Sequence, residues 1–258
     1  MNKESLLKKK FRFKKSLGQN IFIGNLKSLL NSTNFSDDDY VIEVGTGTGD
    51  ITKEIAKRVK FIRSYEIDIR FKEFIDQNII FYKNIEIKYL DFLLETDFPQ
   101  DFKFFSNLPY SKATEILKKC AMLNGLKEGY FMIQKELGER IISKENSKKY
   151  GAISIFLQTF FDFKLIKQFD RSLFYPKPEV DSTFIYFKRK FNWKKDYDLY
   201  EIFLKEIFSK RRKKIKKYLS NYLNNLDIDT NLRPENITVE NYLKIYENFI
   251  RSQDKSNS

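Results

Sequence analysis

The sequence predicts an α/β protein with a doubly wound, mostly parallel sheet and a small all-α domain at its carboxyl end. Two observations support this prediction. Apolar, strand-like segments alternate with amphipathic helical segments from about residue 40 to residue 190, an order typical of a parallel sheet covered by helices. Beyond residue 190 the strand-like segments stop and helical spacing continues. We therefore place one domain at residues 1–190 and a second, helical domain at residues 191–258.

Seven segments have the composition of strands, because each is short, rich in aromatic and β-branched residues and bounded by polar or turn-forming residues. We expect them to form one seven-stranded sheet. In chain order they are YVIEV from residue 40, FIRSYEID from 61, NIEIKYL from 84, FKFFSN from 102, EGYFMIQ from 128, FKLIKQF from 163 and STFIYFKRK from 182.

Helical spacing fills most of the gaps between these strands. Apolar side chains recur every three to four residues in DITKEIAKRV, FKEFIDQNI, SKATEILKKCAML, LGERIIS and AISIFLQTFF, as on one face of a helix. The first of these helices is expected to begin near Asp50, and the third carries Cys120 on its apolar face. By contrast, Pro176 and Pro178 predict a loop over residues 172–182.

The second domain is predicted to contain two helices. An apolar stripe at helical spacing runs through residues 197–226 and includes the basic run KRRKKIKK at residues 210–217, so we expect that run on a helix. The other helix is expected to begin after Thr238, a suitable N-cap residue. The polar tail at residues 251–258 is expected to be loose.

Charge and composition narrow the range of functions. Lys and Arg number 48 against 35 Asp and Glu, which gives a formal net charge of +13. Such an excess favours a polyanionic partner, nucleic acid first and an anionic membrane surface second. The chain has no histidine and one cysteine, which excludes imidazole bases, His-dependent zinc sites and internal disulfides. We expect no metal site and a reducing, cytoplasmic compartment.

The basic amino terminus, MNKESLLKKKFRFKK, lacks the apolar core of a secretory signal. No apolar run in the chain approaches the ~18 residues of a membrane span. The segment suits either a transit peptide or a basic arm of the mature protein, and we favour the arm. Phe11 and Phe13 alternate with basic residues in it. These rings suit two roles, stacking on bases or anchoring the arm to the domain.

A glycine-rich turn and three carboxylates point to a cofactor that contains a nucleoside. Gly45 and Gly47 belong to a G-x-G-x-G turn between the first strand and its helix, where backbone N–H groups can approach a ligand. Glu66 and Asp91 end the next two strands, where they suit ribose hydroxyls and an adenine edge. Glu43, just before the glycines, suits the cationic end of a ligand.

Three interpretations of this turn are open: a nicotinamide dinucleotide site, a site for S-adenosylmethionine (SAM), or a simple tight turn. The spacing is G-x-G-x-G rather than the dinucleotide pattern G-x-G-x-x-G, because Asp50 follows the third glycine. The strand-end acids favour a nucleoside without a pyrophosphate. SAM fits these features best, since it combines an adenosine, an amino acid and a sulfonium.

The stretch SNLPYS at residues 106–111 is expected to face the methyl group of that cofactor. The exocyclic amine of a nucleobase is a poor nucleophile, because its lone pair is delocalised into the ring. The side-chain oxygen of Asn107 and a backbone carbonyl of the rigid turn at Leu108 and Pro109 can each accept one N–H of the amine and aim its lone pair. Tyr110 can stack on the base. The alternative is a plain turn that ends the strand.

Eight motifs follow one another along the chain: KKSLGQNIF, EVGTGTG, YEID, LDF, NLPY, FMIQKELGERI, KKYGAISIFLQ and FYPKPEVDS. Together they resemble the KsgA-type rRNA adenine N6,N6-dimethyltransferases, which are relatives of the Erm methyltransferases, over nearly the whole chain. The resemblance implies a Rossmann-like class I SAM-dependent methyltransferase. It also implies that Phe174 opposes Tyr110 across the target adenine. The implied SAM contacts are Asn20, Phe22, Gly45, Glu66, Asp91 and Asn107.

The chain departs from the family pattern in two places. Ile21 and Phe22 stand where Phe-Leu is commoner, and Thr46 replaces a frequent Pro, Ser or Ala. The first departure affects the side-chain detail expected at Phe22. The remaining motif residues follow the pattern.

The tail segments RRKKIKKYLSN and RPENITVENY resemble KsgA-type rather than Erm-type sequence. This implies dimethylation of two adjacent adenosines near the 3′ end of small-subunit (16S) rRNA, within a precursor subunit. An Erm-type large-subunit enzyme and a non-catalytic RNA-binding assembly factor are the alternatives. We expect a monomer that acts in ribosome biogenesis without a membrane partner. The residues predicted to bind RNA are Lys210, Arg211, Arg212, Lys213, Lys214, Lys216 and Lys217.

Overall fold

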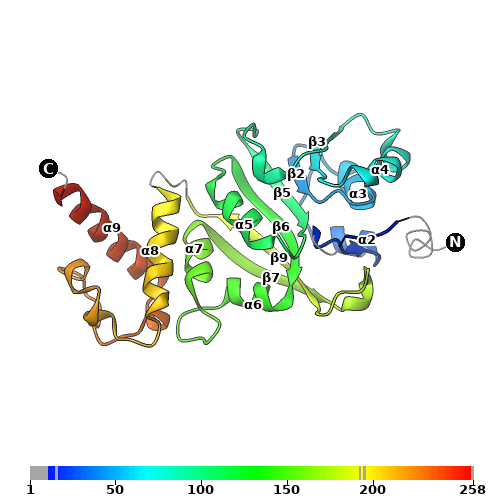
Figure 1. Cartoon of the computed structure of the whole chain (residues 1–258). Helices are drawn as coiled ribbons and strands as arrows, with labels where there is room; N and C mark the ends of the chain where they lie inside the picture. Colours follow the sequence, from blue (N-terminus) through cyan, green and yellow to red (C-terminus); the bar gives the residue numbers. More distant parts are fainter. Residues whose placement is uncertain (1–10, 15–16, 192, 194–195, 257–258) are drawn as a thin grey trace. The chain divides into compact units, whose positions relative to one another are not determined.

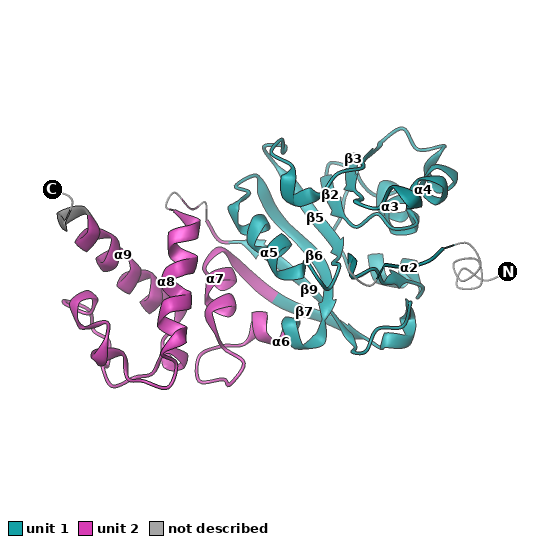
Figure 2. Cartoon of the chain, in the orientation of Figure 1, with its two compact units in different colours: residues 1–138, 164–189 teal, residues 139–163, 190–258 magenta. Residues whose placement is uncertain are grey.

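The computed structural model describes residues 11–14, 17–191, 193 and 196–256 (Figure 1). Contacts between residues divide the chain into two compact units (Figure 2). The first unit comprises Met1–Gly138 and Lys164–Arg189, and the second comprises Glu139–Phe163 and Lys190–Ser258.

The scaffold is a seven-stranded sheet with the strand order β4-β3-β2-β5-β6-β9-β7. Neighbouring strands from β4 to β6 are parallel, whereas β9 runs antiparallel to β6. The predicted seven-stranded, mostly parallel sheet is therefore confirmed. The strands are β2 (Tyr40–Val44), β3 (Phe61–Tyr65), β4 (Ile85–Lys88), β5 (Phe102–Asn107), β6 (Leu126–Gln134), β7 (Phe161–Phe169) and β9 (Ser182–Arg189).

The order of the strands reverses at β2. The chain moves outward from β2 through β3 to β4, and then returns to β5 on the other side of β2. At such a switch point the carboxyl ends of adjacent strands leave a crevice in which ligands bind. The helices associated with this part of the sheet are α2 (Leu26–Leu30), α3 (Asp50–Ala56), α4 (Lys72–Ile79), α5 (Ala113–Met122) and α6 (Lys135–Ile142).

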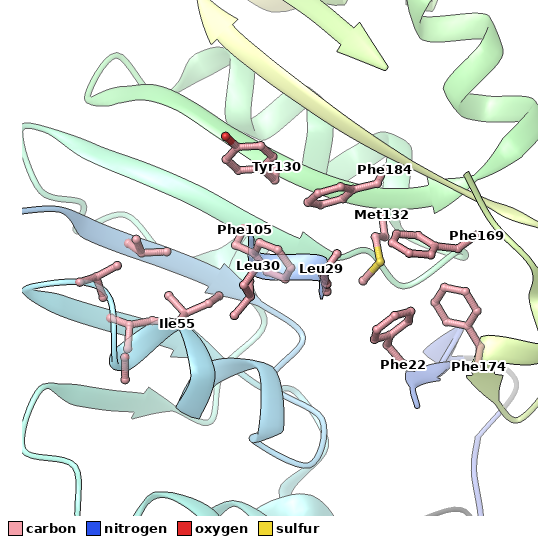
Figure 3. Close-up of a cluster of buried hydrophobic side chains, with 14 residues drawn as sticks. Phe22, Leu29, Leu30, Ile55, Phe105, Tyr130, Met132, Phe169, Phe174 and Phe184 are labelled. Atoms are coloured by element: carbon pink, nitrogen blue, oxygen red, sulfur yellow. The ribbon is translucent and has the colours of Figure 1, made fainter. Parts of the chain in front are cut away.

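A hydrophobic cluster joins one face of the sheet to α2 and α3 (Figure 3). Phe105 of β5 and Met132 of β6 pack in it with Leu30 of α2 and Ile55 of α3, and all four side chains are fully buried. Burial of this apolar surface stabilises the contact between helix and sheet. Because Ile55 fixes α3, the glycine-rich turn that leads into α3 is held over the ends of the strands.

Two short strands that the sequence did not predict form a separate sheet. β1 (Ile21–Phe22) pairs antiparallel with β8 (Phe174–Tyr175), so the predicted loop over residues 172–182 contains a strand. The rings of Phe22 and Phe174 meet edge to face at 5.4 Å, and both belong to the cluster in Figure 3. A strand of two residues is too short to produce a recognisable period in the sequence.

Phe11 and Phe13 anchor the described end of the basic arm. Phe11 is buried and its ring stacks on Phe71 at 4.2 Å. Phe13 meets the ring of Tyr175 edge to face at 5.4 Å. Of the two predicted roles for these rings, the structure therefore supports anchoring. The rest of the arm, at residues 1–10, lies outside the described residues.

The second unit is mainly helical. The N-cap predicted at Thr238 is confirmed, because its hydroxyl accepts the N–H of Asn241 at 3.2 Å. The elements that lie wholly within this unit are the α-helices α7 (Ala152–Phe160), α8 (Tyr197–Ser209) and α9 (Val239–Ser256), with 3₁₀ turns at Ile215–Lys217, Ser220–Tyr222 and Pro234–Asn236.

Two predicted helix boundaries in this unit are wrong. α8 ends at Ser209, so the basic run at residues 210–217 forms a turn and a short 3₁₀ segment. The apolar stripe is interrupted because only Ser, Lys and Arg lie between Phe208 and Ile215, and like charges at helical spacing repel one another. α9 continues to Ser256 through the tail that was expected to be loose, since no Gly or Pro ends it.

The grouping of residues differs from the domain boundary that we placed at residue 190. Residues 139–163 cluster with the carboxyl-terminal helices, because α7 packs against α8 and α9. The ring of Phe156 in α7 stacks on that of Tyr200 in α8 at 6.1 Å. Apolar spacing predicts that such a helix is buried but not which later segment covers it.

Candidate cofactor and methyl-transfer site

A cavity lies at the carboxyl ends of β2, β3, β4 and β5, where the strand order reverses. Residues 17–21, which precede the sheet, form one of its walls. A smaller cavity next to it is lined by Phe22. Gly45, Gly47 and Asn107 line both cavities. The predicted cofactor residues that line the larger cavity are Asn20, Gly45, Gly47, Glu66, Asp91 and Asn107.

The turn after β2 needs glycine at each of its three glycine positions. Gly45, Gly47 and Gly49 have φ angles of +86°, +56° and +80°, a region that other residues rarely adopt. A Cβ atom on Gly47 would also lie 2.7 Å from Cδ1 of Ile21. The turn therefore brings bare backbone against the cavity and against the wall opposite it.

Glu66 connects the glycine turn to the end of β3. Its Oε2 accepts the N–H of Gly47 and its Oε1 accepts the N–H of Asp68, each at 2.8 Å. Burial raises the pKa of Glu66 to about 7, even though these N–H groups favour the ionised form. A carboxylate has about four acceptor positions, so Glu66 keeps capacity for hydroxyl groups in the cavity.

Glu43 lies beneath the glycine turn and does not line the cavity. Its Oε2 accepts the hydroxyls of Thr52 at 2.5 Å and Ser64 at 2.6 Å, and Ser64 is 2.6 Å from the hydroxyl of Thr46. Burial raises the pKa of Glu43 to about 7. Thr46, one of the two departures from the family pattern, thus links this buried carboxylate to the turn above it.

Asp91 follows β4 and caps the short 3₁₀ turn that begins at Phe92. Its Oδ1 accepts the N–H of Leu93 at 2.9 Å. This bond fixes the carboxylate at the rim of the cavity, between Leu90 and Phe92. Asp91 therefore offers Oδ2 to a donor within the cavity.

Asn107 ends β5 and lines both cavities. Its Nδ2 donates to the carbonyl of Asn20 at 2.6 Å, which leaves its side-chain oxygen as an acceptor. The next residues form a tight turn, in which Leu108 is buried and the carbonyl of Pro109 accepts the N–H of Lys112 at 3.0 Å. The amide orientation of Asn107 is thereby set by the wall residue Asn20.

Tyr110 and Phe174, the two rings predicted to enclose the target base, differ in their burial. Tyr110 is half-buried, and its hydroxyl is 2.7 Å from that of Ser182. Phe174 is 1% exposed and packs against Phe22 in the core cluster of Figure 3. The predicted arrangement of these two rings on either side of a base is not present in this conformation, because the Phe174 ring is buried.

Several residues that line the cavity were not predicted from the sequence, among them Ile67, Leu90 and Lys112. Ile67 and Leu90 are apolar yet 56% and 37% exposed, so they supply an apolar rim. Each adjoins a predicted acid, Glu66 or Asp91, and that adjacency is a signal that could have identified them. Lys112 also lines the cavity, two residues after the NLPY motif, and no pattern pointed to it.

The basic residues predicted to bind RNA lie in the second unit. Arg211 pairs with Glu235 and also donates to the carbonyl of Lys148 at 2.8 Å. Lys216 donates to the side chain of Asn231 at 2.9 Å. The members of the basic run with exposed side chains are Arg212, Lys213, Lys214, Lys216 and Lys217.

Neither a membrane span nor a metal cluster occurs in the part of the chain that the structure describes. No helix there is long and apolar enough to cross a membrane. No group of three or more acidic, histidine or cysteine side chains there is arranged to hold a metal ion. Cys120, as predicted, packs in the apolar face of α5, where burial raises the pKa of its thiol.

The strand order, the glycine turn and the acids at the ends of β3 and β4 define a Rossmann-like class I SAM-dependent methyltransferase. A sequence model of the family described as ribosomal RNA adenine dimethylase matches residues 10–251. The chain belongs to this family, and the predictions of an rRNA adenine dimethyltransferase and of SAM as its cofactor are confirmed.

Individual relatives agree with this assignment. The chain is 35% identical to the ribosomal RNA small subunit methyltransferase A of Thermotoga neapolitana over 239 residues, which cover 91% of each chain. It is also 35% identical to the protein of the same name from Malacoplasma penetrans, over 92% of each chain.

Two solved structures are similar in fold. A dimethyladenosine transferase from Plasmodium falciparum matches with a TM-score of 0.73 and 21% identity over 88% of this chain and 95% of that one. The 23S rRNA methyltransferase ErmE matches with a TM-score of 0.64 and 22% identity over 92% of this chain and 98% of that one. Both matches confirm the predicted fold class.

Proposed function

We propose that this enzyme dimethylates the N6 amines of two adjacent adenosines near the 3′ end of small-subunit rRNA, within a precursor of the small ribosomal subunit. Two relatives at 35% identity over more than nine tenths of both chains are small-subunit methyltransferases by name. This similarity supports the small subunit over the large-subunit substrate of an Erm-type enzyme. We further propose that the enzyme acts as a monomer in the cytoplasm.

The residues that line the cavity fit SAM. The free acceptor positions of Glu66 suit the ribose hydroxyls, and Oδ2 of Asp91 suits the amine of the adenine. Gly45 and Gly47 leave room for the ligand to approach the backbone of the turn. Glu43 lies one layer deeper, so its negative charge favours the cationic end of SAM without direct contact.

Two residues ahead of the sheet complete the proposed cofactor contacts. Asn20 lines the larger cavity and Phe22 lines the smaller one. Asn107 lines both, so it stands where the amino-acid end of the cofactor and the entering base would meet. This position makes Asn107 the residue best placed to act on both partners.

The orientation of Asn107 is the observation that carries the proposal. SAM supplies an electrophilic methyl group when bound, and the protein must orient the target amine toward it. Because Nδ2 of Asn107 is committed to Asn20, its oxygen is the acceptor for one N–H of the amine. The carbonyl of Pro109 already accepts the N–H of Lys112 within the turn, so we assign the second acceptor to the carbonyl of Leu108. The methylated amine is cationic and loses its proton to water, and no histidine is required.

Tyr110 is proposed to stack on the flipped-out adenine. Its hydroxyl bonds to Ser182 and holds the ring in place, whereas the ring supplies the stacking. Phe174 can form the other half of the clamp only if β8 moves away from Phe22 when substrate binds. We expect Tyr110→Phe to keep most of the methylation rate and Tyr110→Ala to lose it, as measured by single-turnover methylation.

The basic run of the second unit is proposed to contact rRNA phosphates. Its exposed lysines and arginine project from a backbone fixed by Ile215 and Leu219, which are buried. Rigidly held positive charge suits phosphate contacts, which position a protein on its RNA without reading sequence. We propose, in the same way, that residues 191–258 form a helical domain that binds rRNA.

Transfer of labelled methyl groups from SAM tests the proposal. Purified enzyme is offered immature small subunits and, separately, large subunits. We expect label on two adjacent adenosines of the small-subunit rRNA, and none with a Glu66→Ala variant that remains folded. Label in large-subunit rRNA would support the Erm-type alternative. Binding of small subunits without transfer would support a non-catalytic assembly factor.

A further inference from the structure

Asp68 lies two residues beyond Glu66 and connects three parts of the first unit. Its side chain is only 4% exposed. Its carboxylate accepts from Nε2 of Gln19 at 2.7 Å and from Nε and Nη2 of Arg70 at 2.8 and 2.5 Å. Its backbone N–H donates to Oε1 of Glu66 at 2.8 Å. One residue thus contacts the proposed ribose acid, the cavity wall and a neighbouring arginine.

Arg70 extends this connection to the basic arm. Its Nη1 donates to the carbonyl of Arg12 at 2.9 Å, and its guanidinium lies 4.7 Å from the centroid of the Phe11 ring. Phe11 in turn stacks on Phe71, which lines the cavity. The described end of the arm is therefore held by a hydrogen bond, a cation–π contact and an aromatic stack around the Asp68–Arg70 pair.

Gln19 extends the connection to the cavity wall. It lines the cavity, and its Oε1 accepts the backbone N–H of Lys14 at 3.0 Å while its Nε2 donates to Asp68. The next residue, Asn20, supplies the carbonyl that orients Asn107. A displacement of Gln19 would therefore shift the wall of the cavity that the cofactor is proposed to contact.

Asp68 itself does not line the cavity, so it has no direct contact to offer a ligand there. Its carboxylate accepts from Gln19 and Arg70, and its backbone N–H donates to Glu66. The hydrogen bonds from Arg70 and Gln19 hold the pKa of Asp68 at about 2, well below its ordinary value. The carboxylate is thus charged throughout the neutral range and keeps both partners in place.

We propose that Asp68 is a positioning residue for the cofactor, which fixes Glu66 against the wall at residues 17–21 and docks the basic arm through the same carboxylate. The inference rests on the cofactor occupying this cavity, as proposed above. Because the arm and the ribose acid share one anchor, loosening that anchor weakens cofactor binding without removing any atom that touches the cofactor. Coupling between two distinct binding sites typically changes affinity by about 5- to 150-fold, and we expect an effect at the lower end of this range for a single shared anchor.

Asp68→Asn tests the proposal, because it keeps the size of the side chain and removes its charge. The matched control is Asp76→Asn, since Asp76 also pairs with a nearby cation, Lys72 at 2.8 Å, but is exposed on α4. We expect Asp68→Asn to weaken SAM affinity about tenfold in titration calorimetry, and Asp76→Asn to change it less than twofold. In methylation assays, Asp68→Asn should raise the KM for SAM and leave kcat at saturating SAM within about twofold.

Arg70→Gln provides a second variant, in case Asp68→Asn does not fold. It leaves the bond between Asp68 and Gln19 and removes the docking of the arm, so a smaller loss of SAM affinity is expected. A variant that combines Asp68→Asn with Arg70→Gln should lose no more SAM affinity than Asp68→Asn alone, because both changes break the same connection.

The outcomes separate this inference from the proposed function. If the wild-type protein does not bind SAM, the proposed function is wrong and the inference falls with it. If the wild type binds SAM and Asp68→Asn binds it equally well, only the inference is overturned. A loss of kcat in Asp68→Asn with an unchanged KM for SAM would also overturn it, because positioning of the cofactor predicts the opposite pattern.

Discussion

Two carboxylates, Glu43 and Glu66, carry raised pKa values of about 7 because both are buried near the glycine turn. The charge of Glu66 also raises the pKa of Glu43. In the unfolded chain such carboxyls titrate near 4.5. Between pH 4.5 and 7 the native state therefore holds more protons than the unfolded state, and the free energy of unfolding falls as pH rises. Single residues thus make the ligand-free enzyme less stable at the pH where it is proposed to work.

Glu43→Gln tests this account at the level of one residue. The glutamine side chain has the size of the glutamate side chain but does not titrate. The free energy of unfolding of the variant should therefore depend less on pH than that of the wild type. The difference in unfolding free energy, variant minus wild type, should therefore be about 1–3 kcal/mol more positive at pH 8 than at pH 5. Urea unfolding of the ligand-free proteins at both pH values measures the difference. A constant offset between the two proteins at both pH values would mean that Glu43 does not titrate in this range.

At the scale of elements, the basic run is a turn held at fixed points rather than one face of a helix. Ile215 and Leu219 are buried, and Arg211 is paired with Glu235. The exposed charged side chains in the run therefore extend from a backbone segment that these contacts hold in place. Arg211 has a structural partner, so a test of phosphate binding should leave it intact.

Replacing Arg212, Lys213 and Lys217 together by Gln should weaken binding to small-subunit precursors and flatten its salt dependence. Removing one phosphate contact reduces the steepness of log affinity against log salt by about 0.7–0.9. The affinity for SAM should not change. The slope is measured by filter binding over a range of salt concentrations.

The matched control for this prediction removes the same amount of charge from the first unit. Lys60, Lys83 and Lys164 belong to that unit, and their replacement by Gln should leave the slope closer to that of the wild type. Equal effects of the two triple variants would mean that the basic run acts only through net charge and is not a binding surface.

At the scale of the whole molecule, the sequence predicted those parts of the fold and site that depend on local signals. The seven strands were predicted because each has its own apolar run. The cavity was predicted because Gly45, Glu66, Asp91 and Asn107 each follow or end a strand, and parallel strands bring such residues to one edge. No knowledge of side-chain packing is needed for either step.

The remaining features depend on contacts between distant segments. The burial of Phe174 against Phe22 follows from the pairing of β1 with β8, and neither strand has a pattern of its own. The grouping of α7 with α8 and α9 depends on which helix covers which apolar face. The role of Gln19 likewise follows from its bond to Asp68, 49 residues later in the chain.

The central claim is that Asn107 orients the target amine and does more than hold the cofactor. Single-turnover methylation of small-subunit precursors by Asn107→Ala, together with its SAM affinity from calorimetry, tests this claim most directly. We expect the rate to fall by about 100-fold or more, and the affinity for SAM to fall by less than about tenfold, because the missing oxygen acts on the amine in the transition state. A near-normal rate, or a loss of rate no larger than the loss of SAM affinity, would contradict the claim.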